Sequence, residues 1–98
     1  MNRFGIKIKA LREEADTSQR QFAIALGITP TYMSKIERGE FPPPSEAVIK
    51  KMSALLNYNS DELLAYADKI DSELIEIIKQ DPKFYAKKLR EEHARSKK

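Results

Sequence analysis

One short stretch of the sequence, residues 31–38, carries polar and basic side chains on one face of an expected helix. That face consists of Thr31, Tyr32, Ser34, Lys35 and Arg38. Hydroxyl, ammonium and guanidinium groups donate hydrogen bonds to phosphate oxygens and to the edges of bases. Met33 and Ile36 are apolar, lie three residues apart and are expected to point the other way, into a core. The polar face would then be free to enter the major groove of a duplex.

The charge of the chain is concentrated around this stretch. Residues 1–39 carry seven basic and four acidic side chains, whereas residues 40–98 carry eleven of each. The whole formal net charge of +3 therefore lies in the first two-fifths of the chain. Such an asymmetry favours a polyanionic partner such as nucleic acid.

Two short helices joined by a glycine must position the polar face. Ser18 is expected to cap the first helix, with Gln21 three residues later as in a capping box, and Gly27 to end it. Thr29 is expected to cap the second, with Pro30 at its first position, where the missing N–H costs nothing. The apolar residues that turn both helices toward one core are Phe22, Ala23, Leu26, Ile28, Met33 and Ile36. This pattern predicts a helix-turn-helix.

The remaining chain also reads as helix, so the predicted fold class is all-α. Only three residues are glycine, and no segment alternates in polarity over any length. Further helices are expected to open at Ser45, Ser60, Asp71 and Asp81. Expected buried positions include Phe4, Ile8, Leu11 and Ala15 on the first helix and Val48, Ile49, Met52, Leu55 and Leu56 on the fourth.

Several classes of function are disfavoured by composition. The chain has no cysteine and one histidine, which leaves no set of ligands for a zinc site and no thiol chemistry. No nucleophile–base pair or phosphate-binding glycine loop is recognisable. No apolar run approaches the roughly 18 residues of a membrane span. We therefore expect a cytoplasmic protein that is not an enzyme, uses no cofactor or metal and has no membrane partner.

The helix-turn-helix segment resembles the Cro/XRE family of regulators, the group of the phage lambda repressor. Three features carry the resemblance together: a Ser-Gln start at 18–19, a Leu-Gly-Ile turn at 26–28 and a Ser-Lys-Ile-Glu-Arg-Gly end at 34–39. The resemblance extends over about residues 4–66. It implies a five-helix lambda-repressor-like DNA-binding domain, here residues 1–69 with the motif at 19–39. Members of this family are typically bacterial or phage regulators that bind double-stranded DNA as homodimers.

The resemblance also implies roles for individual residues. Base contacts would fall to Pro30, Thr31, Tyr32 and Lys35, and contacts to the DNA backbone to Gln19, Thr29, Ser34 and Arg38. Arg12 and Glu37 match a buried structural ion pair that joins the first helix to the end of the third. Pro30 and Tyr32 depart from the better-known phage members, because proline offers a base no side-chain hydrogen bond and tyrosine is bulkier than serine or alanine. The alternative roles are a solvated surface lysine for Lys35 and a packing lid for Tyr32.

The C-terminal part, residues 70–98, goes beyond the common core of the family and predicts two more helices. Five large aliphatic residues fall within residues 70–78 and occupy more than one helix face, so a monomer would expose an apolar patch. We predict that this extension is a dimerisation element with a basic tail at 95–98. Its candidate interface residues are Ile70, Leu74, Ile77, Ile78, Phe84, Tyr85 and Leu89. The alternative is that these helices fold back onto the core of their own chain.

Together these features favour a sequence-specific DNA-binding transcriptional regulator. The preferred interpretation is a dimeric repressor that places its third helix in the major groove of an inverted-repeat operator. The first alternative is the antitoxin of a toxin–antitoxin pair, which would bind a protein toxin and repress its own promoter. The second is an adaptor that has lost DNA binding, which Lys35 and Arg38 argue against. Because no effector domain is expected after the core, a regulatory protein partner (a toxin, a protease or an anti-repressor) is a further expectation.

Overall fold

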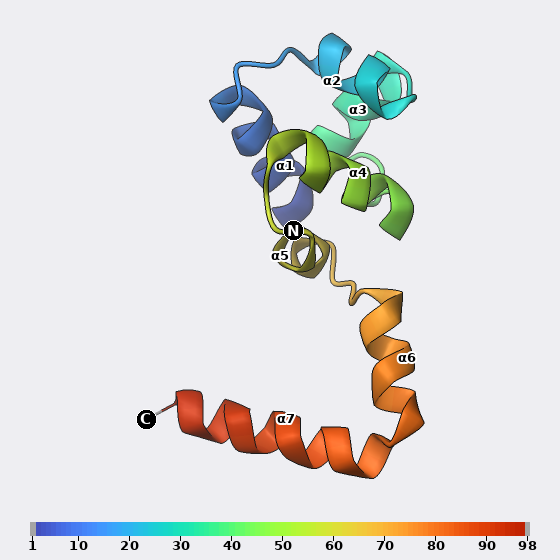
Figure 1. Cartoon of the computed structure of the whole chain (residues 1–98). Coiled ribbons are helices and arrows are strands. Elements are labelled where there is room, and N and C mark those ends of the chain that lie inside the picture. Colours follow the sequence, from blue (N-terminus) through green and yellow to red (C-terminus); the bar gives the residue numbers. More distant parts are fainter. Residues whose placement is uncertain (1, 98) are drawn as a thin grey trace.

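The computed structural model describes residues 2–97, and this part of the chain forms seven α-helices and no strands (Figure 1). The helices are α1 (Arg3–Glu14), α2 (Gln19–Leu26), α3 (Pro30–Glu37), α4 (Glu46–Leu56), α5 (Ser60–Tyr66), α6 (Ser72–Gln80) and α7 (Pro82–Ser96). The predicted all-α fold class is confirmed. No helix within residues 2–97 is long and apolar enough to cross a bilayer.

Local sequence signals explain where the helices of the motif begin and end. Ser18 and Gln21 form the predicted capping box at the start of α2, and Gly27 closes that helix in the left-handed conformation with φ 77°. The Thr29 side chain accepts a hydrogen bond from the Tyr32 backbone N–H at 3.1 Å. The helix-turn-helix predicted from these signals is therefore present.

Helices α1 to α5 pack around one hydrophobic core, and we call them the body. The fully buried large side chains are Phe22, Ile8, Met33, Ile36, Ile49, Met52, Leu63 and Leu64. Two sequence expectations were wrong. Ala15 is exposed because α1 ends at Glu14 and the chain turns away there. Leu55 is 50% exposed because the buried stripe of α4 centres on Ile49 and includes Ser53, whose hydroxyl donates to the Ile49 carbonyl at 3.1 Å.

The start of α1 is fixed directly against the end of α3. The Asn2 side chain accepts from the Gly5 N–H at 3.1 Å and donates to the Glu37 carbonyl at 2.8 Å. A Cβ atom on Gly5 would lie 2.5 Å from the Ile36 carbonyl oxygen, so only glycine allows this approach. The C-terminal end of α3 therefore has a defined position on the body.

Helices α6 and α7 extend away from the body and bend back at Asp81, and we call them the hook (Figure 1). None of their residues is buried, and the hydrophobic core holds no residue beyond Ala67 within the described chain. The structure thus differs from the alternative in which these helices cover the core. Of the basic tail predicted at 95–98, Lys98 lies outside the described residues.

Candidate nucleic-acid interface

The outer face of α3 is the side of that helix that reaches the surface, and within it Tyr32 also packs against the edge of the core. We define it by Thr31, Tyr32, Ser34, Lys35 and Arg38. Two of these residues are exposed and three are half-buried, so all five reach the surface. Met33 and Ile36 hold the opposite side of the helix in the core, 0% and 1% exposed. The hook lies at the far end of the molecule from α3, so the outer face is not covered by it (Figure 1).

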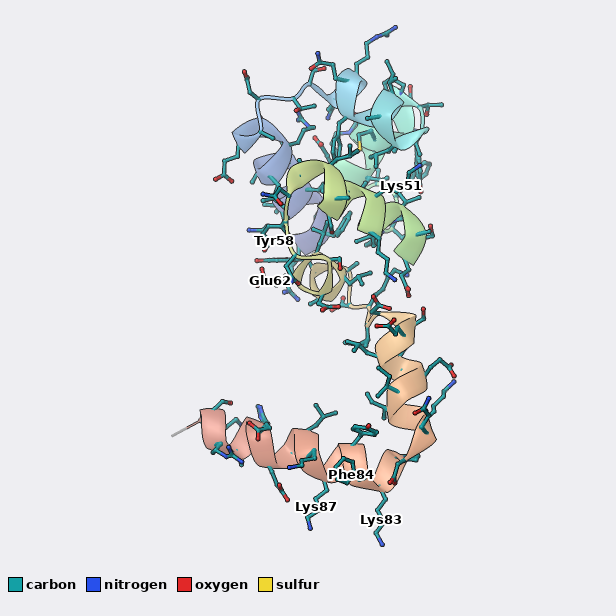
Figure 2. The ribbon with its side chains drawn as sticks, viewed as in Figure 1. Lys51, Tyr58, Glu62, Lys83, Phe84 and Lys87 are labelled. Carbon is teal, nitrogen blue, oxygen red and sulfur yellow. The ribbon has the colours of Figure 1, made fainter. Side chains whose placement is uncertain are left out.

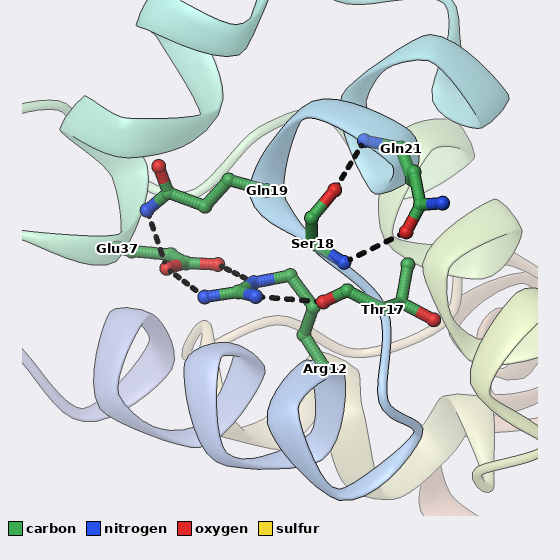
Figure 3. A network of polar contacts seen from close by, with 6 residues as sticks. All are labelled: Arg12, Thr17, Ser18, Gln19, Gln21 and Glu37. Atoms are coloured by element: carbon green, nitrogen blue, oxygen red, sulfur yellow. Dashed lines mark hydrogen bonds and ion pairs between the residues drawn. The ribbon is translucent and has the colours of Figure 1, made fainter.

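A buried ion pair ties α3 to α1 beneath this face (Figure 3). The Arg12 Nε and Nη2 atoms donate to the two Glu37 carboxylate oxygens at 2.7 and 3.1 Å. The Arg12 Nη1 atom donates to the Thr17 carbonyl at 2.7 Å. The hydrogen bond with Glu37 raises the pKa of Arg12 and outweighs the opposing effect of desolvation. The two parallel hydrogen bonds hold the side chains in one arrangement, and the other polar atoms of the pair also have hydrogen-bond partners. The pair is therefore rigid, and its charges cancel.

Gln19, a predicted contact to the DNA backbone, joins the same group of residues. Its Nε2 atom donates to the Glu37 Oε1 atom at 2.8 Å (Figure 3). The first turn of α2 is thereby attached to the last turn of α3. A carboxamide nitrogen carries two N–H bonds, so the second remains available for a phosphate oxygen.

The N-terminus of α3 presents backbone N–H groups and two further candidates. Pro30 stands at the first position of the helix and is exposed. The Thr29 hydroxyl oxygen is the capping acceptor, which leaves its O–H free to donate. Helix N-termini carry a partial positive charge and bind anions such as phosphate. The geometry suits a contact to the DNA backbone at this end of α3.

Two residues of this surface, Glu40 and Phe41, were missed by the sequence analysis. The Phe41 ring lies over the outer face, its centroid 5.8 Å from that of Tyr32 and 5.0 Å from the Lys35 Nζ atom. Glu40 forms an ion pair with Arg38 through the Arg38 Nε atom, which leaves the terminal N–H groups of the guanidinium available for a phosphate. Neither residue belongs to a helix, and no periodic pattern includes them.

The candidate interface residues lie at the surface of the hook or, in the case of Ile70, just before it. Ile70, Leu74, Ile77, Phe84 and Leu89 are exposed, and Ile78 and Tyr85 are half-buried. The Phe84 and Tyr85 rings meet edge to face with centroids 5.1 Å apart. Lys83 and Lys87 point away from the body, along the outer side of α7 (Figure 2). The hook therefore combines a large apolar surface with a charged rim.

A cluster of polar contacts joins the hook to the body. The Glu46 carboxylate accepts from the Ser72 hydroxyl at 2.8 Å and from the Ser72 N–H at 3.2 Å. The Lys50 Nζ atom lies 3.0 Å from Asp71 and 3.3 Å from Glu46. The bonds from Ser72 lower the pKa of Glu46, and the Glu73 N–H together with Lys50 lowers that of Asp71. These contacts fix the first turn of α6 to the first turns of α4.

The fold and this surface define a helix-turn-helix domain of the DNA-binding type. A helix-turn-helix family model matches residues 8–63. The chain belongs to the Cro/XRE-type helix-turn-helix family.

Relatives and solved structures of similar sequence agree with this assignment. The chain is 35% identical over 72 residues to the uncharacterized regulator RghRB of Bacillus subtilis (strain 168), covering 74% of this chain and 52% of that protein. It is 34% identical over 71 residues to the transcriptional repressor RghR of Bacillus subtilis (strain 168), covering 72% of this chain and 53% of that protein. The chain thus spans about half the length of these two relatives.

Two solved structures of the regulator SinR resemble the fold. SinR in complex with DNA is 34% identical, has a TM-score of 0.58 and covers 62% of this chain and 97% of that chain. A chain of the SinR–SinI complex is 25% identical, has a TM-score of 0.59 and covers 97% of this chain and 99% of that chain. The second likeness therefore includes the hook as well as the body.

Proposed function

We propose that this protein is a sequence-specific transcriptional repressor that binds DNA as a homodimer. Residues 1–69 are the proposed DNA-binding domain, and residues 70–98 are the proposed dimerisation element. A repressor is favoured because a relative over 72% of the chain is named as one. Its place of action would be the cytoplasm of a bacterium, where it would block transcription from the promoter it covers.

The observation that carries the proposal is the outer face of α3, which the hook leaves uncovered (Figure 1) and which stands on a rigid support. Thr31, Tyr32 and Lys35 offer hydroxyl and ammonium donors to base edges, and Pro30 offers an apolar surface to a thymine methyl or a sugar. Thr29, Ser34, Gln19 and Arg38 flank them and suit phosphate contacts. The solved complex of SinR with DNA, similar over 62% of this chain, supports this use of the fold.

The dimer is proposed from the exposed apolar surface of the hook. Small monomeric proteins rarely leave a patch of this kind open to water. A second copy of the hook would cover it, since a two-fold interface places the same residues on both sides. Two linked domains would then read two half-sites of an inverted repeat, about 34–36 Å apart, and gain affinity through effective concentration.

A regulatory protein that competes for the hook is a second proposed partner. The similarity to the SinR–SinI complex extends over 97% of this chain and so includes the hook. Such a partner would dissociate the homodimer, so that its two DNA-binding domains are no longer linked. Binding to the operator would then be weaker. The antitoxin alternative has no support from the relatives named above, which are described as transcriptional regulators.

Selection of bound duplexes from random DNA tests the proposed function. We expect one enriched sequence with two-fold symmetry, and a loss of about 10³–10⁵ in affinity between 50 and 200 mM salt for 6–10 phosphate contacts. Light scattering on the free protein is the second measurement, with a mass of twice 11.3 kDa expected. If no sequence is enriched even at low salt, sequence-specific DNA binding is rejected. If light scattering gives the mass of one chain, the dimer is rejected.

A further inference from the structure

The chain turns after α3 and brings the Phe41 ring beside Tyr32 and Lys35 of the outer face. Gly39 makes the turn with φ 76°, a conformation that side chains rarely adopt. The N–H groups of Glu40 and Phe41 then both donate to the Lys35 carbonyl, at 2.9 and 3.3 Å. Phe41 is thereby attached to the last turn of α3 and lies outside the core.

The ring of Phe41 contacts two candidate base-reading residues. Its centroid lies 5.8 Å from the Tyr32 centroid with the ring planes at 53°, and 5.0 Å from the Lys35 Nζ atom. Tilted aromatic pairs and cations over a ring face are both attractive arrangements. Because Tyr32 and Lys35 are three residues apart on α3, one ring restrains both side chains.

The segment that follows Phe41 restricts the backbone that carries the ring. Pro42, Pro43 and Pro44 come next, and the residue before a proline is restricted to extended backbone conformations. Pro44 is buried in the body, which anchors this stiff segment. Phe41 remains 42% exposed, so a core-packing role does not account for it.

We infer that Phe41 is a specificity-determining positioning residue, which holds Tyr32 and Lys35 in the conformations that read bases. The inference rests on the proposed function of α3. A lysine that is already held loses less conformational entropy when it binds, and this gain applies only where the restrained conformation matches the duplex. Phe41 therefore increases affinity for the cognate sequence and leaves affinity for other duplexes unchanged.

Binding to the duplex selected by the wild type tests the inference. We expect Phe41→Ala to lose about tenfold in affinity for that duplex, or ~1.4 kcal/mol. Affinity for an unrelated duplex should stay within about twofold, because phosphate contacts dominate it. Phe41→Tyr should retain specific binding, and Phe41→Leu, which keeps apolar bulk without a ring, should behave like Phe41→Ala.

The matched control is Leu55→Ala. Leu55 is similarly exposed, at 50%, but it lies on the last turn of α4. The residues that follow it, 56–58, line a hollow together with the end of α1. This variant should bind both duplexes like the wild type. All variants should unfold at the wild-type temperature, which excludes a general loss of structure.

A double-mutant cycle separates positioning from direct contact. In a Tyr32→Ala, Lys35→Ala background, Phe41→Ala should cause no further loss, because the ring then has nothing to hold. An undiminished loss in that background, or an equal loss on every duplex, would show that Phe41 itself touches DNA and would overturn the inference. An unchanged affinity of Phe41→Ala would overturn it as well.

A measurement without DNA distinguishes failure of the inference from failure of the proposed function. The ring current of Phe41 should shift the Lys35 methylene protons upfield in the NMR spectrum of the wild type, and Phe41→Ala should abolish this shift. Lys35 protons at ordinary positions in the wild type would overturn the positioning even if DNA binds. A wild type that selects no duplex would instead remove the proposed function on which the inference rests.

Discussion

The body buries eleven hydrophobic side chains and the Arg12–Glu37 ion pair, whereas no residue of α6 or α7 is buried. Both regions consist of amphipathic helices with defined caps. The body completes its core within one chain, but the hook presents its apolar side chains to solvent. Helix formation and stable packing are therefore separate requirements, and the proposed dimer would supply the packing that the hook does not find within its own chain.

Loss of the ion-pair partner Glu37 is the largest effect that we expect. Glu37→Ala would leave the Arg12 guanidinium buried without its carboxylate, at a cost of about 3–5 kcal/mol in the free energy of unfolding. Urea denaturation followed by circular dichroism measures it. The hook provides the control: Glu76 pairs with Lys79 at 3.5 Å while about two-thirds exposed, and Glu76→Ala should cost less than about 1 kcal/mol. Equal losses in the two variants would contradict the contrast between the regions.

Truncation of an apolar side chain should also distinguish the two regions. Leu63 is fully buried in the body, and Leu63→Ala should destabilise the protein by about 2–5 kcal/mol at every protein concentration. Leu89 is 58% exposed on the hook, so Leu89→Ala should act through dimerisation. The unfolding temperature of the wild type should rise with protein concentration, and Leu89→Ala should weaken this dependence. An unfolding temperature of the wild type that does not vary with concentration would count against the dimer.

A smaller effect is expected for a single contact to a base. Lys35→Ala should lower affinity for the selected operator by about 1–3 kcal/mol without loss of stability. Arg20→Ala, also a removed cation in the motif but on the exposed side of α2, should change affinity much less. Fluorescence anisotropy at fixed salt measures the affinity of both variants. An equal loss of affinity would mean that only the removed positive charge matters and would contradict a base contact by Lys35.

The hydrogen bonds that join the body to the hook should depend on pH. Hydrogen bonds from Ser72 lower the pKa of Glu46 in the folded protein, so their contribution is complete above the ordinary carboxyl value of about 4.3. It is lost as the pH falls through the lowered pKa. The NMR shift of the Ser72 amide should report this titration, whereas the Tyr32 amide, which donates to the Thr29 hydroxyl, should not move with it. A titration midpoint at or above the ordinary carboxyl pKa would contradict the hydrogen bonds between Ser72 and Glu46.

Much of the body was predictable because its signals are local. The capping residues Ser18 and Thr29, the left-handed Gly27 and the start of α3 at Pro30 each depend on a few neighbouring residues. Leu55 shows where this reasoning fails, because a hydrophobic pattern cannot show that Ser53, bonded to its own helix, takes the buried position instead.

The contacts that could not be predicted join residues far apart in sequence or lie outside helices. Asn2 reaches the end of α3, and Glu46 reaches Ser72 across 26 residues. Phe41 is set by the turn at Gly39 and by the backbone of Lys35, which no periodicity encodes. The candidate site was thus predictable as a helix face, but the residues that brace it required the structure.

The most direct test of the central claim is a repeated selection from random DNA with a variant in which Thr31, Tyr32 and Lys35 are all alanine. Thr31 is exposed, and Tyr32 and Lys35 are half-buried, with Tyr32 packed against the edge of the core. Circular dichroism and light scattering on the variant should therefore first show the fold and the mass of the wild type. We predict that the sequence enriched by the wild type is no longer enriched, while weak binding to any duplex persists. Enrichment of the same sequence by the variant would contradict the claim that the outer face of α3 reads DNA.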